Sequence, residues 1–159
     1  MIVGIDSMVI IYAGLAPVIA ENKDNPDFVL LKRRAISLID RILQDNHQLA
    51  ISTISIAEIL QRVPVNQHPS LTQEFAKRFI CAEFDIRAAA NAAKICRENE
   101  QLIESLKSSD RKVVKADAMI IASIHGVGAK KFYTHDKRCR NMATSLIEAL
   151  DIPKAETLF

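Results

Sequence analysis

The sequence predicts an α/β fold built around a parallel sheet. Short apolar segments alternate along the chain with longer segments in which apolar residues recur at helical spacing. Such alternation is typical of crossover units, which place successive strands parallel in one sheet. The first short segment, from Ile2 to Ile5, has the apolar character of a central strand covered on both faces, and the carboxylate of Asp6 follows it directly. We therefore treat this strand as the centre of the fold.

Size and composition predict one globular domain. The chain has 159 residues, enough for a domain with its own core, and 49% hydrophobic residues argue against a disordered chain. A net charge of +2 does not by itself indicate a nucleic-acid partner. Cys81, Cys96 and Cys139 lack the spacing of a zinc site or redox pair. With no signal-peptide or membrane-span pattern, we expect a cytoplasmic protein that does not enter a membrane.

Turn and capping residues divide the chain into elements. Asn25 and Pro26 predict a helix start, Pro64 a helix end, and Gly126 and Gly128 another end. Later strands are expected at 47–52, 79–84 and 130–134, with an edge strand or tail at 152–159. Helices are expected at 8–15, 26–42, 54–63, 70–78 (capped by Ser70 or Thr72), 85–107 (the longest), 113–125 and 137–150, with a polar loop at 107–112.

Two acids occupy positions that ordinary packing does not explain. Asp6 ends the first strand, and ligands of open α/β sheets bind beyond the carboxyl ends of the strands. Its alternative role is to cap the next helix together with Ser7. Asp117 shares a helix face with Ile120 and Ile121, where an unpaired carboxylate costs several kcal/mol. The alternative is that a helix starts just before Asp117, which then lies in its first turn.

Two further acids follow other predicted strands. Glu58 lies on the helix after the second strand, from which its side chain can reach the same edge as Asp6. The alternative for Glu58 is a capping box with Ser55 and a surface ion pair with Arg62. Asp136 follows the strand that ends at Thr134, although turns are generally rich in aspartate.

Together the four carboxylates predict a metal site. Two like charges ~4 Å apart repel by about 4 kcal/mol at an effective dielectric near 20, so a cation must lie between them. Oxygen ligands without His or Cys favour Mg²⁺ or Mn²⁺, and such ions promote phosphodiester hydrolysis. Nearby Lys115, Lys137 and Arg138 are candidate contacts to a nucleic-acid backbone, the alternative being a solvated charged face.

Four short motifs, in this order and spacing, resemble those of the PIN domain. They are I-D-S after the first strand, S-T-I-S-I-A-E around Glu58, K-A-D-A-M-I-I-A around Asp117 and F-Y-T-H-D around Asp136. The resemblance spans Ile2 to Asp136 and is closest to small bacterial ribonucleases of VapC type. It implies a single PIN-like domain over residues 1–159, with a three-layer α/β/α fold and a central parallel sheet of four to five strands.

The resemblance also implies an activity and partners. It implies Mg²⁺- or Mn²⁺-dependent endonucleolytic cleavage of RNA, with Asp6, Glu58, Asp117 and Asp136 as the metal-binding, catalytic set. Ser7 and Thr134 match positions where a hydroxyl orients the carboxylates. Relatives of this type often form homodimers and are held inactive by a small antitoxin, so the chain is expected to be the toxin of a type II toxin–antitoxin pair.

The chain departs from the family pattern in a few positions. Met8 replaces a polar residue, Lys137 and Arg138 stand where many relatives carry a further acid, and Cys139 replaces an aromatic residue. A non-catalytic PIN-like module that binds RNA or protein therefore remains the alternative. A phosphatase with Asp6 as nucleophile is disfavoured because Met8 leaves no D-x-D motif.

Overall fold

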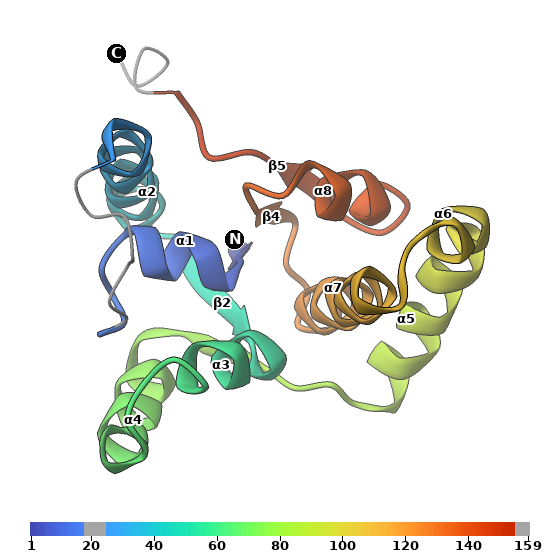
Figure 1. The fold of residues 1–159 in the computed structure, drawn as a ribbon. Helices are drawn as coiled ribbons and strands as arrows, with labels where there is room; N and C mark the ends of the chain where they lie inside the picture. The colour runs from blue at the N-terminus through green and yellow to red at the C-terminus, as the bar shows by residue number, and fades with distance from the viewer. Residues whose placement is uncertain (18–24, 155–159) are drawn as a thin grey trace.

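A parallel sheet with β1 at its centre organises the computed structural model, which describes residues 1–17 and 25–154 (Figure 1). Within these residues the sheet has five strands in the order β3-β2-β1-β4-β5, and every pairing is parallel. This confirms the predicted α/β fold with a central parallel sheet. The strands are β1 (Ile2–Ile5), β2 (Gln48–Ser52), β3 (Ile80–Ala82), β4 (Lys131–Tyr133) and β5 (Glu148–Leu150).

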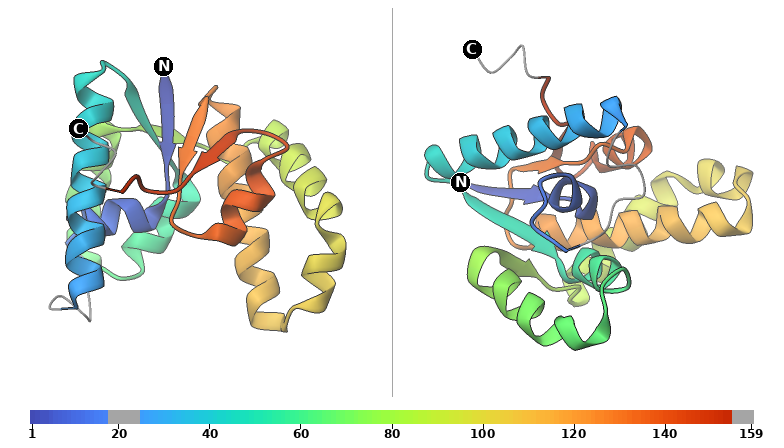
Figure 2. Two further views of the ribbon diagram at one scale, coloured as in Figure 1. Left: turned by 90° about the horizontal axis from the view of Figure 1, so that it is seen from above. Right: turned by 60° about the vertical axis from the view of Figure 1, so that its left-hand side comes forward.

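Helices cover both faces of the sheet, which gives the three layers that the resemblance implies (Figure 2). One face packs against α1 (Ser7–Tyr12), α2 (Pro26–Gln44), α3 (Thr53–Leu60) and α4 (His68–Arg78), which follows a short 3₁₀ turn, Val65–Gln67. The other face packs against α7 (Ser108–Gly126) and α8 (Lys137–Ala143), and α5 (Ile86–Glu98) and α6 (Glu100–Ser105) pack on α7. Each face has its own apolar core.

The central strand contacts both layers because its side chains alternate. Val3 and Ile5 are buried in the core beneath α1 and α2. Gly4 points to the other face, where an added Cβ would lie 2.2 Å from Ile124 Cγ2 of α7. The glycine therefore allows α7 to pack directly on β1, which brings Asp117 of α7 and Asp6 to the same region of the fold.

Capping and turn residues place the start of α2 and the end of α7 as the sequence predicts. Asn25 Oδ1 accepts a hydrogen bond of 2.9 Å from the Asp27 amide, and Pro26 occupies the first turn of α2. At the other end of the chain, α7 ends at Gly126 and Gly128 takes a positive φ of 80° in the turn before β4. The three cysteines are free thiols.

The predicted helix at 85–107 and the loop at 107–112 are wrong. The helix breaks at Asn99, whose side-chain amide donates 2.8 Å to the Ile95 carbonyl and ends α5. The polar residues after Lys107 are the first turns of α7, which begins at Ser108. They look like a loop because they face solvent, whereas Val114 begins the buried face.

Two other boundaries are also wrong. The predicted helix at 137–150 ends at Ala143, and Glu148–Leu150 instead pairs with β4 as the edge strand β5. Residues 152–154 lie outside any strand, and 155–159 lie outside the described residues. Helix α4 begins at His68, so Ser70 and Thr72 are not its caps; their hydroxyls donate to carbonyls of the preceding turn. In the described part of the chain, no helix is both long and apolar enough to span a membrane.

Candidate metal site at the carboxyl edge of the sheet

Asp6 uses its two carboxylate oxygens for two different tasks. It caps α1, because Oδ1 accepts a 2.7 Å hydrogen bond from the Ser7 amide. Oδ2 accepts 2.8 Å from the hydroxyl of Thr134, at the end of the neighbouring strand β4. The Asp6 amide also donates 3.0 Å to the Tyr133 carbonyl. The capping role is therefore real, but it leaves one oxygen oriented by a residue far away in the sequence.

Ser7 connects Asp6 to Glu58. Its hydroxyl lies 3.0 Å from Glu58 Oε2 and 3.3 Å from Asp6 Oδ1, and its single hydrogen can be donated to either oxygen. Burial raises the pKa of Glu58, the Ser7 hydrogen bond opposes this, and the Asp6 charge adds to it. Helix α3 therefore brings Glu58 to the edge where β1 ends.

The capping-box interpretation of Glu58 is wrong. Helix α3 begins at Thr53, and its cap is Ser52, whose hydroxyl accepts 3.2 Å from the Ile54 amide. Ser55 lies inside the helix, and its buried hydroxyl has no hydrogen-bond partner. The alternative surface pair with Arg62 is also not formed within the described residues, where no ion pair joins Arg62 to Glu58.

Asp117 is an acid in the middle of a helix rather than in a first turn. Helix α7 starts at Ser108, which excludes the alternative of a helix beginning just before Asp117. Its Oδ2 is buried and has no hydrogen-bond partner. Burial raises the pKa of Asp117 to about 7; the carboxylates of Asp6, Asp136 and Glu58 add to the rise, and the Arg138 guanidinium opposes it.

Asp136 and Thr134 belong to the turn between β4 and α8. Asp136 caps α8, because its Oδ1 accepts 2.7 Å from the Arg138 amide and 3.2 Å from the Cys139 amide. Thr134 is fully buried, and its hydroxyl accepts 3.2 Å from the Asp136 amide while it donates to Asp6. One hydroxyl thus connects two of the four predicted acids.

The four acids form one electrostatically coupled group. The pKa of Asp6 is raised by burial and by Asp136, against the hydrogen bonds from Thr134 and Ser7. Across residues 1–17 and 25–154, none of the four acids forms an ion pair with Lys or Arg. In the same residues, no three His, Cys, Asp or Glu side chains already form a set that could enclose an ion. The group is thus a cluster of carboxylates without a paired cation, not a closed coordination shell.

The three predicted nucleic-acid contacts lie at different distances from this group. Arg138 is half-buried, and its positive charge opposes the rise in the pKa of Asp117. Its Nε is buried without a hydrogen-bond partner. Lys137 is exposed in the first turn of α8. Lys115 is exposed, and its charge opposes the rise in the pKa of the Cys96 thiol of α5 that burial causes. Lys115 therefore lies on a different side of α7 from Asp117. Arg138 is accordingly the candidate most closely joined to the acids.

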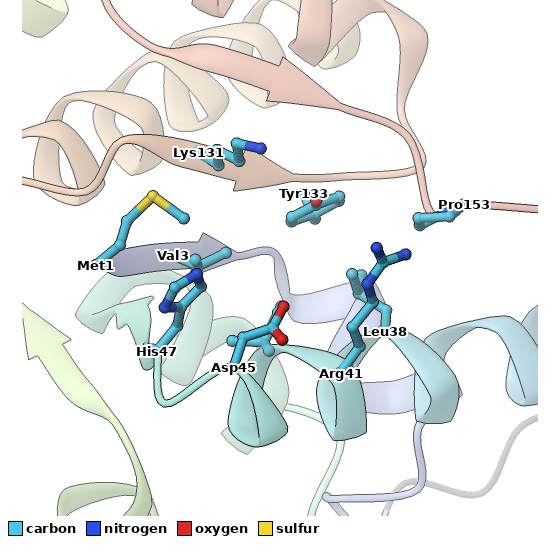
Figure 3. Close-up of a pocket in the computed structure, with 10 residues that line it drawn as sticks. Met1, Val3, Leu38, Arg41, Asp45, His47, Lys131, Tyr133 and Pro153 are labelled. Atoms are coloured by element: carbon cyan, nitrogen blue, oxygen red, sulfur yellow. The ribbon is translucent and has the colours of Figure 1, made fainter. Parts of the chain in front are cut away.

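A hollow of about 310 Å³ opens beside Glu58. Apolar and polar residues of α1, of α3 and of the turn after α3 line it, namely Ser7, Met8, Ile11, Glu58, Gln61 and Arg62. A second pocket, of about 220 Å³, lies between α2 and the amino-terminal half of β1 (Figure 3). Arg41, Asp45 and Lys131 line that second pocket, but none of the four acids does. Of these two pockets, the first adjoins the carboxylate group through Glu58.

Three residues that the sequence does not predict as part of the site surround Thr134 and Asp136. Arg140 donates 2.9 Å to the Thr134 carbonyl, and Asp151 accepts 2.9 Å from His135 Nδ1. In the sequence, Arg140 is one basic residue among several, His135 is a lone histidine, and Asp151 belongs to no motif. These contacts depend on how β4, α8 and the segment after β5 meet in space.

Comparison with solved structures identifies the fold. The chain is similar to "VapBC2 from Rickettsia felis bound to a DNA fragment from their promoter", with a TM-score of 0.61 and 17% identity over 95% of this chain and 98% of that one. The fold is PIN-like. VapBC-1 from nontypeable Haemophilus influenzae gives a TM-score of 0.62 and 16% identity, covering 95% and 98% of the two chains. FitAcB from Neisseria gonorrhoeae gives 0.55 and 18%, covering 94% and 96%.

The sequence itself carries no comparable match. No family model matches it, and the comparison with curated proteins found no significant match. Structural similarity at sequence identities below 20% establishes the PIN-like fold. The chemistry has to be argued from the site itself. The resemblance inferred from the four motifs is thus confirmed at the level of structure, over nearly the whole chain.

Proposed function

We propose that this protein is a metal-dependent endoribonuclease that hydrolyses RNA phosphodiester bonds, and that it is the toxin of a type II toxin–antitoxin pair. The observation that carries the proposal is Asp117. Its carboxylate lies mid-helix, with a buried oxygen that lacks a partner and a pKa raised to about 7 by burial and by three other acids. A folded protein retains such an arrangement at a cost in stability, which a bound cation would offset.

The donor atoms suit Mg²⁺ or Mn²⁺. Asp6, Glu58, Asp117 and Asp136 supply only carboxylate oxygens, the ligands that hard divalent cations prefer. Asp117 Oδ2 is free to bind, and the oxygens of Asp6 keep lone pairs beyond their hydrogen bonds. When bound, such an ion favours ionisation of a water and offsets charge on a phosphate.

Hydroxyl groups of the chain would hold the acids in place for that chemistry. Thr134 fixes Oδ2 of Asp6, and Ser7 bridges Asp6 and Glu58, so these side chains do not have to reorder when a cation binds. Arg138 would contact the phosphate nearest the acids, while Lys137 and Lys115 would contact the RNA backbone further away. The hollow beside Glu58 offers room for a nucleotide next to the site.

The proposed partners follow from the similar structures. The solved VapBC2, VapBC-1 and FitAcB structures resemble this chain over nearly its full length. By analogy we assign it a small antitoxin, and from the family resemblance and the sequence we carry over a homodimeric state and a place in the cytoplasm. Co-expression with the product of an adjacent short reading frame, followed by size-exclusion chromatography, would test this assignment.

The decisive test of the activity compares two Asp→Asn variants. Defined RNAs are incubated with wild type, Asp6→Asn and Asp40→Asn, with Mg²⁺ or Mn²⁺ and then with excess chelator. Asp40 is exposed on α2, so its variant carries the same chemical change away from the site. Wild type and Asp40→Asn should cleave only with metal. Asp6→Asn should reduce the cleavage rate by at least about 100-fold, which exceeds the ~10–100-fold loss typical of residues that only hydrogen-bond to a metal ligand.

The same assay separates the alternative function. A non-catalytic module would bind RNA equally well with and without chelator, and no preparation would cleave it. Cleavage by Asp6→Asn at the wild-type rate would instead exclude Asp6 from the site and leave the metal assignment without its first ligand.

A further inference from the structure

Arg140 holds the backbone of the turn that carries Thr134 and Asp136. From α8, its Nη1 donates 2.9 Å to the Thr134 carbonyl and lies 3.4 Å from Oδ1 of Asp151. The Thr134 amide donates 3.0 Å to the Leu150 carbonyl of β5. Thr134 is therefore held through its amide, its carbonyl and its hydroxyl at once, and the hydroxyl is the group that orients Asp6.

Asp151 accepts two hydrogen bonds on one oxygen, which also forms an ion pair with Arg140. Its Oδ1 accepts 2.8 Å from the Ile152 amide and 2.9 Å from His135 Nδ1, beside the Arg140 guanidinium. The hydrogen bonds and the charge of Arg140 outweigh the effect of partial burial and lower the pKa of Asp151. Asp151 is thus an ionised anchor between the segment after β5 and the turn after β4.

The segment that carries Asp151 is itself fixed to the core. Ile152 is buried among the residues beneath α1 and α2. Arg34 of α2 donates to the carbonyls of both Ile152 and Pro153. Asp151 therefore has a rigid base, which a side chain must have if it is to hold another segment in place.

We propose that Arg140 and Asp151 act as positioning residues, which hold the Thr134–Asp136 turn so that Thr134 fixes the carboxylate of Asp6. The expected effect of this pair on RNA cleavage rests on the proposed nuclease function. Its structural content is separate: the pair determines how firmly the turn is held. Neither residue belongs to the acidic set, and neither would touch the reacting atoms.

Two features distinguish this pair from an ordinary surface ion pair. The Arg140 side chain is only 20% exposed, whereas Arg78 in its pair with Glu74 is 56% exposed. One Arg140 nitrogen serves both a carbonyl and a carboxylate, so its loss leaves the Thr134 carbonyl without that donor. Surface pairs such as Arg78 with Glu74 contribute little and contact no part of the site.

The test compares Arg140→Met, Arg140→Lys and Asp151→Asn with the control Arg78→Met, which removes the same charge from α4. The first measurement is amide hydrogen exchange by NMR at Thr134 and Asp136. The second is kcat and KM on one defined RNA, and the third is Mn²⁺ affinity by calorimetry. Asp151→Asn retains an acceptor for the Ile152 amide, so it serves as the milder variant if Arg140→Met folds poorly.

We expect Arg140→Met to speed exchange at Thr134 and Asp136 and to lower kcat and Mn²⁺ affinity by about tenfold, with KM little changed. Arg140→Lys should restore most of this, because a single nitrogen can make both contacts. Unchanged exchange at the two amides, or an equal kcat loss in Arg78→Met, would overturn the proposal. If wild type cleaves no RNA, the nuclease function fails separately, and the exchange data still decide whether the pair positions the turn.

Discussion

The two edges of the sheet differ in how their charges are arranged. At the carboxyl edge lie four acids, Asp6, Glu58, Asp117 and Asp136, whose negative charges raise pKa values within the group. In the described part of the chain, no lysine or arginine forms an ion pair with any of them. At the amino edge, Arg41, Lys131 and Asp45 line the pocket of Figure 3 together with apolar side chains such as Val3 and Leu38. The first edge brings four carboxylates together, whereas the second pocket has a single carboxylate, Asp45, among its lining residues.

This difference indicates that the carboxyl edge destabilises the folded protein. A buried carboxylate without a partner destabilises the folded state, and nothing in packing alone requires Asp117 on the apolar face of α7. Charges at the amino edge remain in contact with solvent and cost little. The contrast is the physical basis for placing the function at the carboxyl edge.

The largest expected effect concerns Asp117 and pH. Because its pKa is raised from 3.8 to about 7, the folded state binds this proton more tightly than the unfolded state does. Metal-free wild type should therefore lose stability as pH rises from about 4 to about 7. Asp117→Asn cannot ionise and should avoid this loss, so at pH 8 it should be more stable than wild type, by on the order of a few kcal/mol.

Urea unfolding at pH 4 and pH 8 in chelator measures that difference. The control is Asp45→Asn at the amino edge, an exposed site where the change should stay within about 0.5 kcal/mol at both pH values. An Asp117→Asn variant no more stable than wild type at pH 8 would mean that the two edges do not differ in strain as described.

An intermediate effect is expected from Thr134→Val, which removes the hydroxyl while keeping the shape. Asp6 Oδ2 then loses its 2.8 Å donor and the Asp136 amide loses its acceptor. Cleavage should fall by about 10–100-fold at saturating Mg²⁺. Thr144→Val is the matched control, because that hydroxyl only donates to the Asn141 carbonyl at an exposed site. Equal rates for the two variants would show that Thr134 does not orient the site.

The smallest effect is expected at the amino edge itself. Arg41→Ala removes a cation that lines the second pocket, away from the four acids. Initial cleavage rates should stay within about twofold of wild type, and the unfolding free energy should change by no more than about 0.5 kcal/mol. Loss of cleavage in this variant would join the two edges functionally and remove the contrast between them.

The sequence predicts the acids and the sheet centre because both depend on local patterns. An apolar run that ends in Asp6 and the cap at Asn25 are readable within a few residues. The polar first turns of α7 are not readable in this way, because they face solvent and the buried apolar face of the helix begins only at Val114. Edge strand β5 is short and follows a helical pattern, so only its pairing with β4 defines it.

The site was predictable as a set of acids but not as a network. Asp117 is conspicuous because an acid among isoleucines contradicts helical patterning. The roles of Arg140 and Asp151 depend on contacts across separate elements, and a charged residue in a turn or short helix has no distinguishing pattern. For Glu58, a plausible local motif with Ser55 pointed to the wrong cap, because Ser52 begins the helix.

Binding of Mn²⁺, read as the melting temperature of wild type and Asp6→Asn, tests most directly whether the four carboxylates act as one cation site. Wild type should melt at progressively higher temperature as Mn²⁺ is raised into the millimolar range, with about 2.7 kcal/mol of stabilisation at 100 times Kd. Asp6→Asn should show little or no rise. A wild-type melting temperature that does not respond to saturating Mn²⁺, or an equal rise in both proteins, would contradict this account.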